Sequence, residues 1–419
     1  MWKTAINDIL IICIAQKGVK CLFAILLFPV YILLNIYIVH RIINALKRCH
    51  DIFYKRWMKI IISIIYGIFA LSPIIGFVMP YGTQLKRISQ RIANYWFALL
   101  IYAFFVVVIG HLLSLLLRRV LKVMPMDFFK RRKTTATGAI ISLVLIATVS
   151  IYGMYNARDI KLNNYSVTVD KSVSNMEKMK VVLISDLHMG YSIGLDHIQK
   201  TVDIINAQNP DLVCIAGDIY DNDYNAIEEP DKMAKIFASI KSTYGTYACW
   251  GNHDINERIL SGFTFDFGGK KQHDTRMYDF FEKANIKLLA DEVTLIDNKF
   301  YVAGRVDRDK PATENNKAKS PEELLEGLDK TKPIITIYHE PDQLSELANA
   351  GTDLLLCGHT HDGQIFPGNL ITKLSWENSC GYLKKGNMHN IVTSGVGVYG
   401  PYIRVGTHAE VVSIDVSFK

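Results

Sequence analysis

The sequence predicts an α/β protein in two parts: an N-terminal region of four transmembrane helices, followed by a layered α/β domain. Half of the 419 residues are hydrophobic, and these crowd into the first 155 positions. Beyond that region, short aliphatic runs alternate with segments that have the period of an amphipathic helix. This alternation is typical of sheets covered by helices.

The first part contains four apolar runs that are long enough to cross a bilayer, which takes roughly 20 helical residues. We therefore expect residues 1–155 to form a membrane anchor, with spans at 21–40, 57–80, 95–117 and 137–155.

The basic residues indicate how these spans are oriented. Of the formal net charge of +7, much lies in the loops after the first and third spans, which hold Arg41, Lys47, Arg48, Lys55, Arg56 and Lys59, and Arg118, Arg119, Lys122, Lys130, Arg131, Arg132 and Lys133. By the positive-inside rule these two loops are cytoplasmic, which places everything after residue 155 outside the cytoplasm. The second part lacks a basic stripe interleaved with aromatic residues, so no nucleic-acid partner is expected.

The second part begins with a polar stretch, residues 156–178, which we interpret as a linker that leads into an edge strand. From residue 179 to 419 we expect one domain, with strands at 180–185, 211–216 and 244–249 separated by helices. After about residue 285 the pattern becomes richer in strands. Two sheets packed face to face and flanked by helices, in four αββα layers, account for both halves.

Polar metal-binding side chains follow five of the predicted strands. They are Asp186 and His188, Asp218, Asn252, His339, and the pair His359 and His361. Each has a structural alternative when taken alone: Asp218 as a helix cap, Asn252 as a turn residue, His339 as a hydrogen-bonded core histidine. Five such clusters in one domain favour a divalent-metal site built from oxygen and imidazole ligands.

These clusters also resemble the ordered motifs of a known family. The calcineurin-like metallophosphoesterase superfamily has five blocks that are similar to Asp186-x-His188, Gly217-Asp218-x-x-Asp221, Gly251-Asn252-His253-Asp254, His339 and Gly358-His359-x-His361. The stretches Asn156-Ala157-Arg158, Gly358-His359-Thr360-His361-Asp362-Gly363-Gln364 and Ser394-Gly395-Val396-Gly397, the last with Pro401 and Arg404, resemble its membrane-anchored branch more closely. That branch includes UDP-2,3-diacylglucosamine pyrophosphatase-like enzymes and transmembrane metallophosphoesterases. Asp362 stands where this branch commonly has a second glycine.

The resemblance implies two divalent metal ions, either Mn, Fe or Zn, with Mn favoured. One would be held by Asp186, His188 and His361, the other by Asn252, His339 and His359, with Asp218 bridging them. A metal-bridging hydroxide would attack phosphorus in line. His253 would protonate the leaving oxygen, while Asp221 would hold its tautomer and raise its pKa.

We therefore expect a membrane-anchored phosphohydrolase, a phosphodiesterase or pyrophosphatase acting on a lipid-linked or cell-envelope phosphate. One alternative is a phosphomonoesterase or phosphoprotein phosphatase; another is a catalytically idle membrane sensor or scaffold. Two segments between the motifs, Ile255–Arg276 and Asp307–Ser320, are candidate lids or substrate walls, and a disordered, solvated loop is an equal alternative for the second. Within the first, Phe263, Phe265 and Phe267 alternate with smaller residues, which favours a β-hairpin over an apolar lip facing lipid.

Overall fold

The computed structural model describes residues 19–123, 128, 131–260, 263–265, 271–312 and 317–419. The chain divides into two compact units. The first comprises Met1–Tyr152 with Arg258–Gly269, and the second Gly153–Glu257 with Lys270–Lys419. We call them the membrane unit and the α/β unit.

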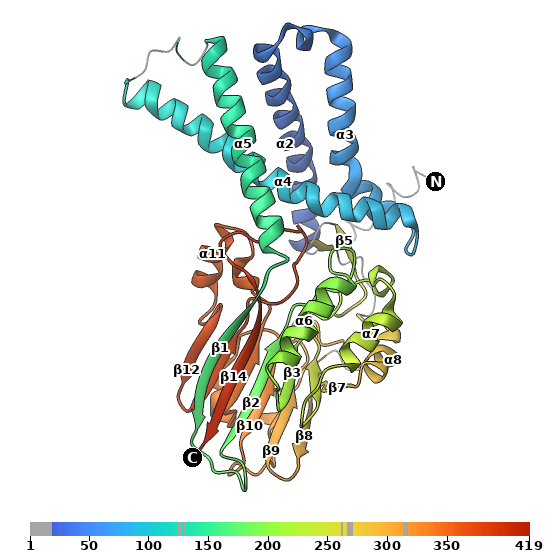
Figure 1. The fold of residues 1–419 in the computed structure, drawn as a ribbon, viewed down its shortest axis with the longest axis vertical. Coiled ribbons are helices and arrows are strands. Elements are labelled where there is room, and N and C mark those ends of the chain that lie inside the picture. The colour runs from blue at the N-terminus through green and yellow to red at the C-terminus, as the bar shows by residue number, and fades with distance from the viewer. Residues whose placement is uncertain (1–18, 124–127, 129–130, 261–262, 266–270, 313–316) are drawn as a thin grey trace. The chain divides into compact units, whose positions relative to one another are not determined.

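The membrane unit is built from four long helices (Figure 1): α2 (Val19–Cys49), α3 (Arg56–Val78), α4 (Gln84–Leu115) and α5 (Arg132–Asn156). All four are long and apolar enough to cross a membrane. Four apolar helices at the N-terminal end were expected from the sequence, and this part of the predicted fold class is confirmed.

A small polar network joins three of these helices. The Tyr31 hydroxyl donates to the Ala70 carbonyl at 2.7 Å and accepts from the indole N–H of Trp96 at 3.1 Å. The Tyr66 hydroxyl donates to Asn35 Oδ1 at 2.9 Å. Because lipid offers no hydrogen-bond partners, such bonds between helices satisfy polar groups and fix how α2, α3 and α4 pack.

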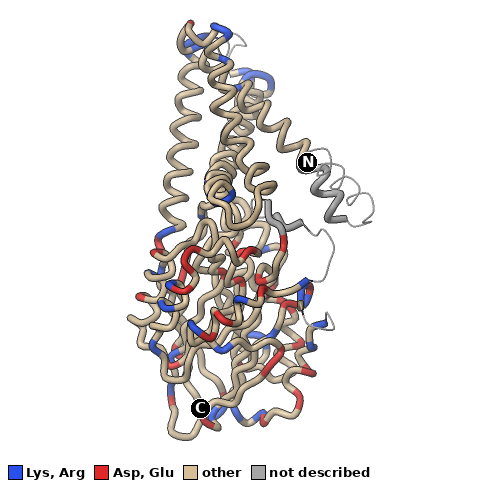
Figure 2. Tube along the Cα trace, turned by 90° about the vertical axis from the view of Figure 1, so that its right-hand side faces the viewer, with Lys and Arg blue, Asp and Glu red and all other residues tan. Residues whose placement is uncertain are grey.

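The end of α2 and the beginning of α5 lie together at one end of the membrane unit. Arg132 Nε donates to the Arg48 carbonyl at 2.8 Å, and Arg48 Nη1 donates to Thr135 Oγ1 at 2.9 Å. Figure 2 shows Lys and Arg gathered at the helix ends, whereas the lengths of the helices are almost free of charge. Residues that border the two basic loops therefore lie at the same end of the membrane unit.

The α/β unit contains two six-stranded sheets. The first has the order β1-β14-β2-β3-β4-β7, with β1 Ile160–Val169, β14 Ala409–Phe418, β2 Lys178–Ile184, β3 Leu212–Ala216, β4 Thr246–Cys249 and β7 Ile286–Leu288. The second has the order β12-β13-β11-β10-β9-β8, with β12 Gly381–Lys385, β13 Met388–Val392, β11 Leu354–Cys357, β10 Ile334–Ile337, β9 Phe300–Gly304 and β8 Glu292–Ile296.

The main core lies between the two sheets. Fully buried aliphatic residues from the first sheet, such as Val181 and Leu183, share one cluster with Ile335, Ile337 and Leu356 from the second. Strands buried on both faces read as continuous apolar runs, which is why they could be located in the sequence.

Helices cover the outer faces of both sheets. On the first lie α6 (Leu195–Ala207), α7 (Pro230–Ala238) and α8 (Arg276–Lys283), as Figure 1 shows. On the second lie α9 (Pro321–Leu324) and α10 (Leu344–Ala350), whereas α11 (Gly368–Ser375) contacts the short turn His361–Gly363 and has no buried residue. Leu344 and Leu347 of α10 pack on the outer face of β11 and β13. The four αββα layers predicted from the sequence are confirmed.

Two connections were not predicted in detail. β1 pairs in parallel with β14 along its whole length, from Ile160 opposite Ala409 to Val169 opposite Phe418. Between β4 and α8, the strands β5 (Arg258–Leu260) and β6 (Phe263–Phe265) form an antiparallel hairpin, which confirms the hairpin prediction for Phe263 and Phe265. Phe267 lies outside the described residues.

Candidate metal centre

The predicted site residues follow the carboxyl ends of five strands. β2 leads to Asp186 and His188, β3 to Asp218, and β4 to Asn252 and His253, while β10 leads to His339 and β11 to His359 and His361. The strands β2, β3 and β4 are mutually parallel, as are β9, β10, β11 and β13. All these side chains therefore emerge at the same edge of the two-sheet sandwich, where ligands bind in layered α/β folds.

The backbone at these strand ends is strained. Five of the site residues have a left-handed conformation: Asp186 (φ 54°), His188 (φ 44°), Asp218 (φ 51°), His359 (φ 72°) and His361 (φ 50°). Each such residue costs of order 1–3 kcal/mol and persists only where surrounding bonds fix it. The His188 amide, for example, donates to the Asp218 carbonyl at 3.0 Å, and the Asp186 amide to the Gly217 carbonyl at 3.1 Å.

Two glycines allow the strand ends to approach one another. A Cβ atom on Gly251 would collide with the amide nitrogen and Oδ1 of Asp218, and one on Gly358 would collide with Ser185 Oγ and Asp186 Oδ2. The glycines in the Gly-Asn-His-Asp and Gly-His-x-His motifs are therefore required by space, not by turn conformation.

The ligand atoms form two groups. In the first, His361 Nε2 lies 3.2 Å from Asp186 Oδ1 and 3.1 Å from His188 Nε2. In the second, His359 Nδ1 lies 3.0 Å from Asn252 Oδ1 and 3.3 Å from His339 Nε2. The structure thus brings together the residues that the family resemblance assigned to each of two metal ions.

Asp218 joins the two groups through one oxygen atom. Its Oδ2 lies 3.6 Å from His188 Nε2 in the first group and 3.0 Å from His339 Nε2 in the second. Asp186 and Asp218 are completely buried, as are His188 and His339. Buried carboxylates of this kind require positive charge beside them.

The electrostatics of the cluster fit divalent cations. Burial raises the pKa of Asp218, but His339 and His253 outweigh it and hold the pKa well below its ordinary value. Burial also raises the pKa of Asp186, but His361 opposes this effect, so the pKa of Asp186 is lowered overall as well. Both carboxylates are therefore ionised. The facing Nε2 atoms of His188 and His361 would repel as two lone pairs unless a cation or proton lay between them, so the donor set fits a metal.

His253 has a different partner from the one expected. Its Nδ1 lies 2.5 Å from Asn222 Oδ1, not against Asp221, and its amide donates to Asp218 Oδ1 at 2.7 Å. Since an amide oxygen only accepts, His253 carries its proton on Nδ1. Burial, opposed by Asp218, lowers the pKa of His253 well below 6.5, whereas we expected it to be raised. Both predictions about the partner and the pKa of His253 were wrong.

Asp221 instead approaches a metal-ligand histidine. Its Oδ1 lies 3.5 Å from His188 Nδ1, on the side of the ring opposite the cluster. Burial lowers the pKa of His188, but the nearby carboxylates of Asp221 and Asp218 raise it above 6.5 overall. A carboxylate behind a ligating imidazole orients the ring and makes it a better ligand.

Asp254 and Arg404, neither of them a predicted ligand, hold the loops of the site in place. Asp254 Oδ1 accepts from the amides of Ile219 and Tyr220 at 2.7 and 3.0 Å, and Oδ2 from that of Gly251 at 2.8 Å. It thereby ties the Asp218 loop to the Asn252 loop. The buried Arg404 guanidinium donates to the Ser394 and Gly397 carbonyls, both at 2.7 Å, which fixes the loop over Asp186.

The segment from Asp307 also reaches the site. Lys310 Nζ donates to the Asn252 carbonyl at 3.3 Å and to Glu257 Oε2 at 2.6 Å. Asp307 is completely buried, and its Oδ1 accepts from the Lys310 amide at 2.6 Å. The beginning of the predicted substrate wall therefore lies against the second ligand group, while residues 313–316 of that segment are outside the described residues.

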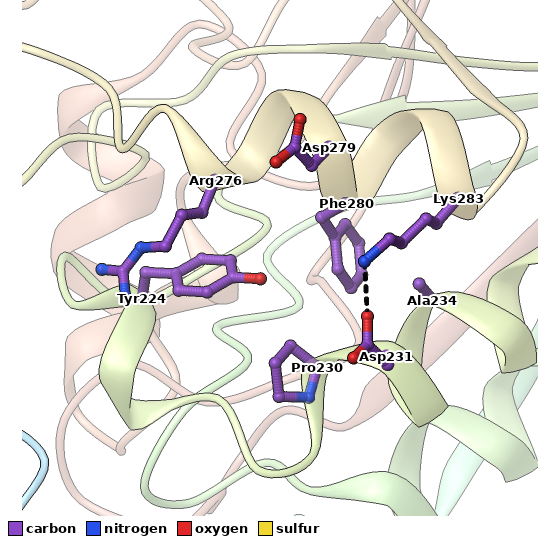
Figure 3. A pocket seen from close by; sticks show the side chains of 8 residues that line it. All are labelled: Tyr224, Pro230, Asp231, Ala234, Arg276, Asp279, Phe280 and Lys283. Atoms are coloured by element: carbon purple, nitrogen blue, oxygen red, sulfur yellow. Dashed lines mark hydrogen bonds and ion pairs between the residues drawn. The ribbon is translucent and has the colours of Figure 1, made fainter.

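A separate surface pocket of about 230 Å³ lies between α7 and α8 (Figure 3). Lys283 Nζ pairs with Asp231 Oδ1 at 2.7 Å across it, and Arg276 stacks on the Tyr224 ring at 4.3 Å. None of the predicted site residues lines this pocket.

Comparison with known proteins agrees with this geometry. Residues 179–363 match the family model of the calcineurin-like phosphoesterases, and this region of the chain belongs to that family of metal-dependent hydrolases. A "transmembrane protein with metallophosphoesterase domain" of Danio rerio is 27% identical over 66% of this chain.

Two further relatives show how far the similarity extends. An uncharacterized metallophosphoesterase of Campylobacter jejuni is 26% identical over 95% of this chain and 99% of its own length, which includes the membrane helices. The phosphodiesterase YaeI of Escherichia coli is 25% identical over 58% of this chain and 83% of its own length. The match to the fish protein spans 62% of that protein, less than two thirds of it.

Proposed function

We propose that the chain is a binuclear metal-dependent phosphohydrolase, a phosphodiesterase or pyrophosphatase acting on a lipid-linked or cell-envelope phosphate. The observation that carries the proposal is the sharing of Asp218 Oδ2 between two groups of ligand atoms, at 3.6 and 3.0 Å. One carboxylate oxygen between two ligand sets is the arrangement that a two-metal phosphoesterase requires.

Asp186, His188 and His361 would hold one divalent ion, and Asn252, His339 and His359 the other, with Asp218 between them. The absence of thiolate and the mixture of carboxylate, amide and imidazole ligands suit Mn, Fe or Zn, with Mn favoured. When bound, such ions would generate a nucleophile from water near neutral pH and offset charge on the phosphoryl oxygens.

The remaining residues position and move protons. Because Asn222 accepts the proton on Nδ1, His253 presents Nε2 as a free acceptor. Nε2 would take up a proton and pass it to the oxygen of the leaving group. Asp221 would keep the His188 ring oriented through its Nδ1.

Diester or anhydride cleavage is favoured over monoester cleavage by the similarity to a protein named as a phosphodiesterase. A phosphomonoesterase or phosphoprotein phosphatase is the second candidate. The full ligand set argues against a catalytically idle sensor, since such a protein would not need buried carboxylates facing four histidines.

The experiment is hydrolysis of bis-p-nitrophenyl phosphate and p-nitrophenyl phosphate by the full chain in detergent, with Mn²⁺, Zn²⁺ or EDTA. We expect metal-dependent diester cleavage that falls by about 10³-fold or more in Asp218→Asn, because this change removes the shared charge. The matched control is Asp231→Asn, an exposed carboxylate outside the site. Faster monoester cleavage would favour the second candidate, and activity that survives in Asp218→Asn would refute the proposed site.

We also propose that the α/β unit lies outside the cytoplasm. The hydrogen bonds between Arg48, Arg132 and Thr135 support a common side for both basic loops, and the positive-inside rule makes that side cytoplasmic. Fusions at residue 160 to a periplasm-dependent and a cytoplasm-dependent reporter test this. Signal from the cytoplasmic reporter alone would overturn the orientation but not the hydrolytic activity.

A further inference from the structure

The α/β unit has an exposed apolar helix beside the metal centre. In α11 (Gly368–Ser375) no residue is buried. Four large apolar side chains at or just before it are exposed: Phe366 by 50%, Leu370 by 52%, Ile371 by 63% and Leu374 by 89%. An isolated helix this short is not stable in water, and packing of its apolar face normally holds such a helix in place.

The three side chains within α11 share one face. Leu370 and Leu374 are one helical turn apart, and Ile371 adjoins both, so the three occupy a single stripe. Between Phe366 and Trp376 the only charged residue is Lys373. An apolar stripe with a basic residue and no acidic one is typical of a helix that lies in the interface of a bilayer containing anionic lipid.

Hydrogen bonds link the last turn of α5 to the segment of the α/β unit that leads to α11. The final turn of α5, from Gly153 to Asn156, belongs to the α/β unit and contacts the segment 403–407. The Arg404 amide donates to the Gly153 carbonyl at 3.0 Å, and Asn156 Nδ2 donates to the carbonyls of Arg404 and Thr407 at 3.1 and 2.7 Å.

The same segment leads to α11. Val405 pairs with Ile365, and the Phe366 amide donates to the Val405 carbonyl at 2.8 Å. Two backbone hydrogen bonds, from Arg404 to Gly153 and from Phe366 to Val405, thus connect the end of α5 to the residues just before α11.

The helix is also coupled to the metal centre at both of its ends. Two residues before its start lies Phe366, in the stretch that follows the site residue His361 and the short turn His361–Gly363. Immediately after its end, the Trp376 ring packs edge-on against the ring of His359, with centroids 5.3 Å apart. The residue that follows the end of α11 therefore lies against a predicted metal ligand.

We infer that α11 docks on the bilayer that the chain's own helices cross, with Phe366, Leu370, Ile371 and Leu374 inserted among the lipid headgroups. The continuity with the end of α5 and the single basic residue favour lipid over a protein partner as the occupant. Docking would hold the metal centre at headgroup depth, where a lipid phosphate could reach it without leaving the membrane. That consequence for substrate rests on the proposed hydrolytic function; the docking itself does not.

The test is photo-crosslinking of the full chain reconstituted in vesicles of phosphatidylcholine and phosphatidylglycerol. Leu374→p-benzoylphenylalanine places the probe on the stripe, and Ile371→p-benzoylphenylalanine repeats the measurement should the first variant fold poorly. The control is Leu295→p-benzoylphenylalanine, at an apolar position that is 41% exposed in β8, the opposite edge strand from β12 in the second sheet.

After irradiation, phospholipid adducts on the peptides are quantified by mass spectrometry. We expect about tenfold more lipid adduct at 374 and 371 than at 295, since the apolar face of an interfacial helix lies roughly 5–10 Å inside the headgroup boundary. Equal labelling at the three positions, or adducts to protein in place of lipid at 371 and 374, would overturn the inference. Because no step reads hydrolysis, failure here is distinguishable from failure of the proposed function.

Discussion

At the scale of single residues, Asp221 and its neighbour Asn222 each hold one histidine of the site, whereas the family motif led us to expect this role of Asp221 alone. Asp221 supports His188 at 3.5 Å, while Asn222 holds His253 at 2.5 Å. A neutral amide fixes the tautomer of an imidazole but does not stabilise its protonated form, whereas a carboxylate does both. His253 is therefore oriented by a partner that leaves its pKa low.

We predict that Asn222→Ala lowers kcat about 10-fold to 100-fold with little change in KM, because His253 loses its orientation but not its contact with the Asp218 loop. The loss should be larger for a phenyl diester than for a p-nitrophenyl diester, since phenolate is the poorer leaving group and depends more on protonation. Asn225→Ala in the same loop is the control. An equal loss with both leaving groups would mean that Asn222 is merely structural.

His273 provides a pH-dependent prediction away from the ligands. Its ring stacks on Trp250 with centroids 4.0 Å apart, and Nδ1 donates to the Asp254 carbonyl at 2.5 Å. Burial lowers the pKa of His273 to about 4 from 6.5. Between these two values the unfolded chain binds a proton that the folded chain does not, so the free energy of unfolding rises with pH across that window.

The corresponding experiment is thermal unfolding of the full chain in detergent as a function of pH. His273 should contribute up to about 3 kcal/mol above pH 6.5 that is lost by pH 4. The variant His273→Asn keeps a donor for the Asp254 carbonyl and cannot titrate, so the pH dependence in this window should become shallower. An unchanged slope would contradict the prediction.

At the scale of elements, the ends of strands were readable from the sequence and the turns after them were not. The runs before Asp186, Asp218 and His339 are buried on both faces and could be found by composition alone. Whether Asp221 or its neighbour faces His253 depends on a loop that continues from Asp218 in a left-handed conformation, which reverses the direction of the side chains that follow. Such turns leave no periodic signal.

The pairing of β1 with β14 escaped prediction for a related reason. Pairing between strands about 240 residues apart has no local signature, although each strand could be predicted separately. The exposed apolar stripe of α11 was likewise hidden, since its residues resemble any short buried helix until their exposure is known.

We predict that Asn156→Ala destabilises the α/β unit by about 1–3 kcal/mol, because the carbonyls of Arg404 and Thr407 both lose their donor. The change in unfolding midpoint, measured by limited proteolysis of the full chain, checks this. Asn164→Ala, an exposed position in β1, is the matched control and should shift the midpoint much less. Equal shifts of the unfolding midpoint in the two variants would show that the hydrogen bonds from Asn156 to the segment 403–407 contribute nothing specific.

At the scale of the whole molecule, metal binding and folding should be linked in one unit only. All seven predicted ligands lie in the α/β unit. We predict that EDTA lowers the unfolding temperature of this unit and that Mn²⁺ restores it, since a ligand at a hundred times its Kd adds about 2.7 kcal/mol to the free energy of unfolding. The Asp218→Asn variant should respond weakly to either addition. A change in unfolding temperature as large as that of the unmodified chain would mean that the metal binds at a different site.

The parallel pairing of β1 with β14 has a consequence for biogenesis. β1 directly follows α5 in the chain, yet β14, the strand that pairs with it among the described residues, arrives after some 240 further residues have been synthesised. A nascent chain must therefore keep an unpaired, ten-residue strand edge next to the insertion machinery until translation has passed β14. Chaperone capture of that edge, and degradation of chains stalled before residue 409, would act as a checkpoint on completed synthesis.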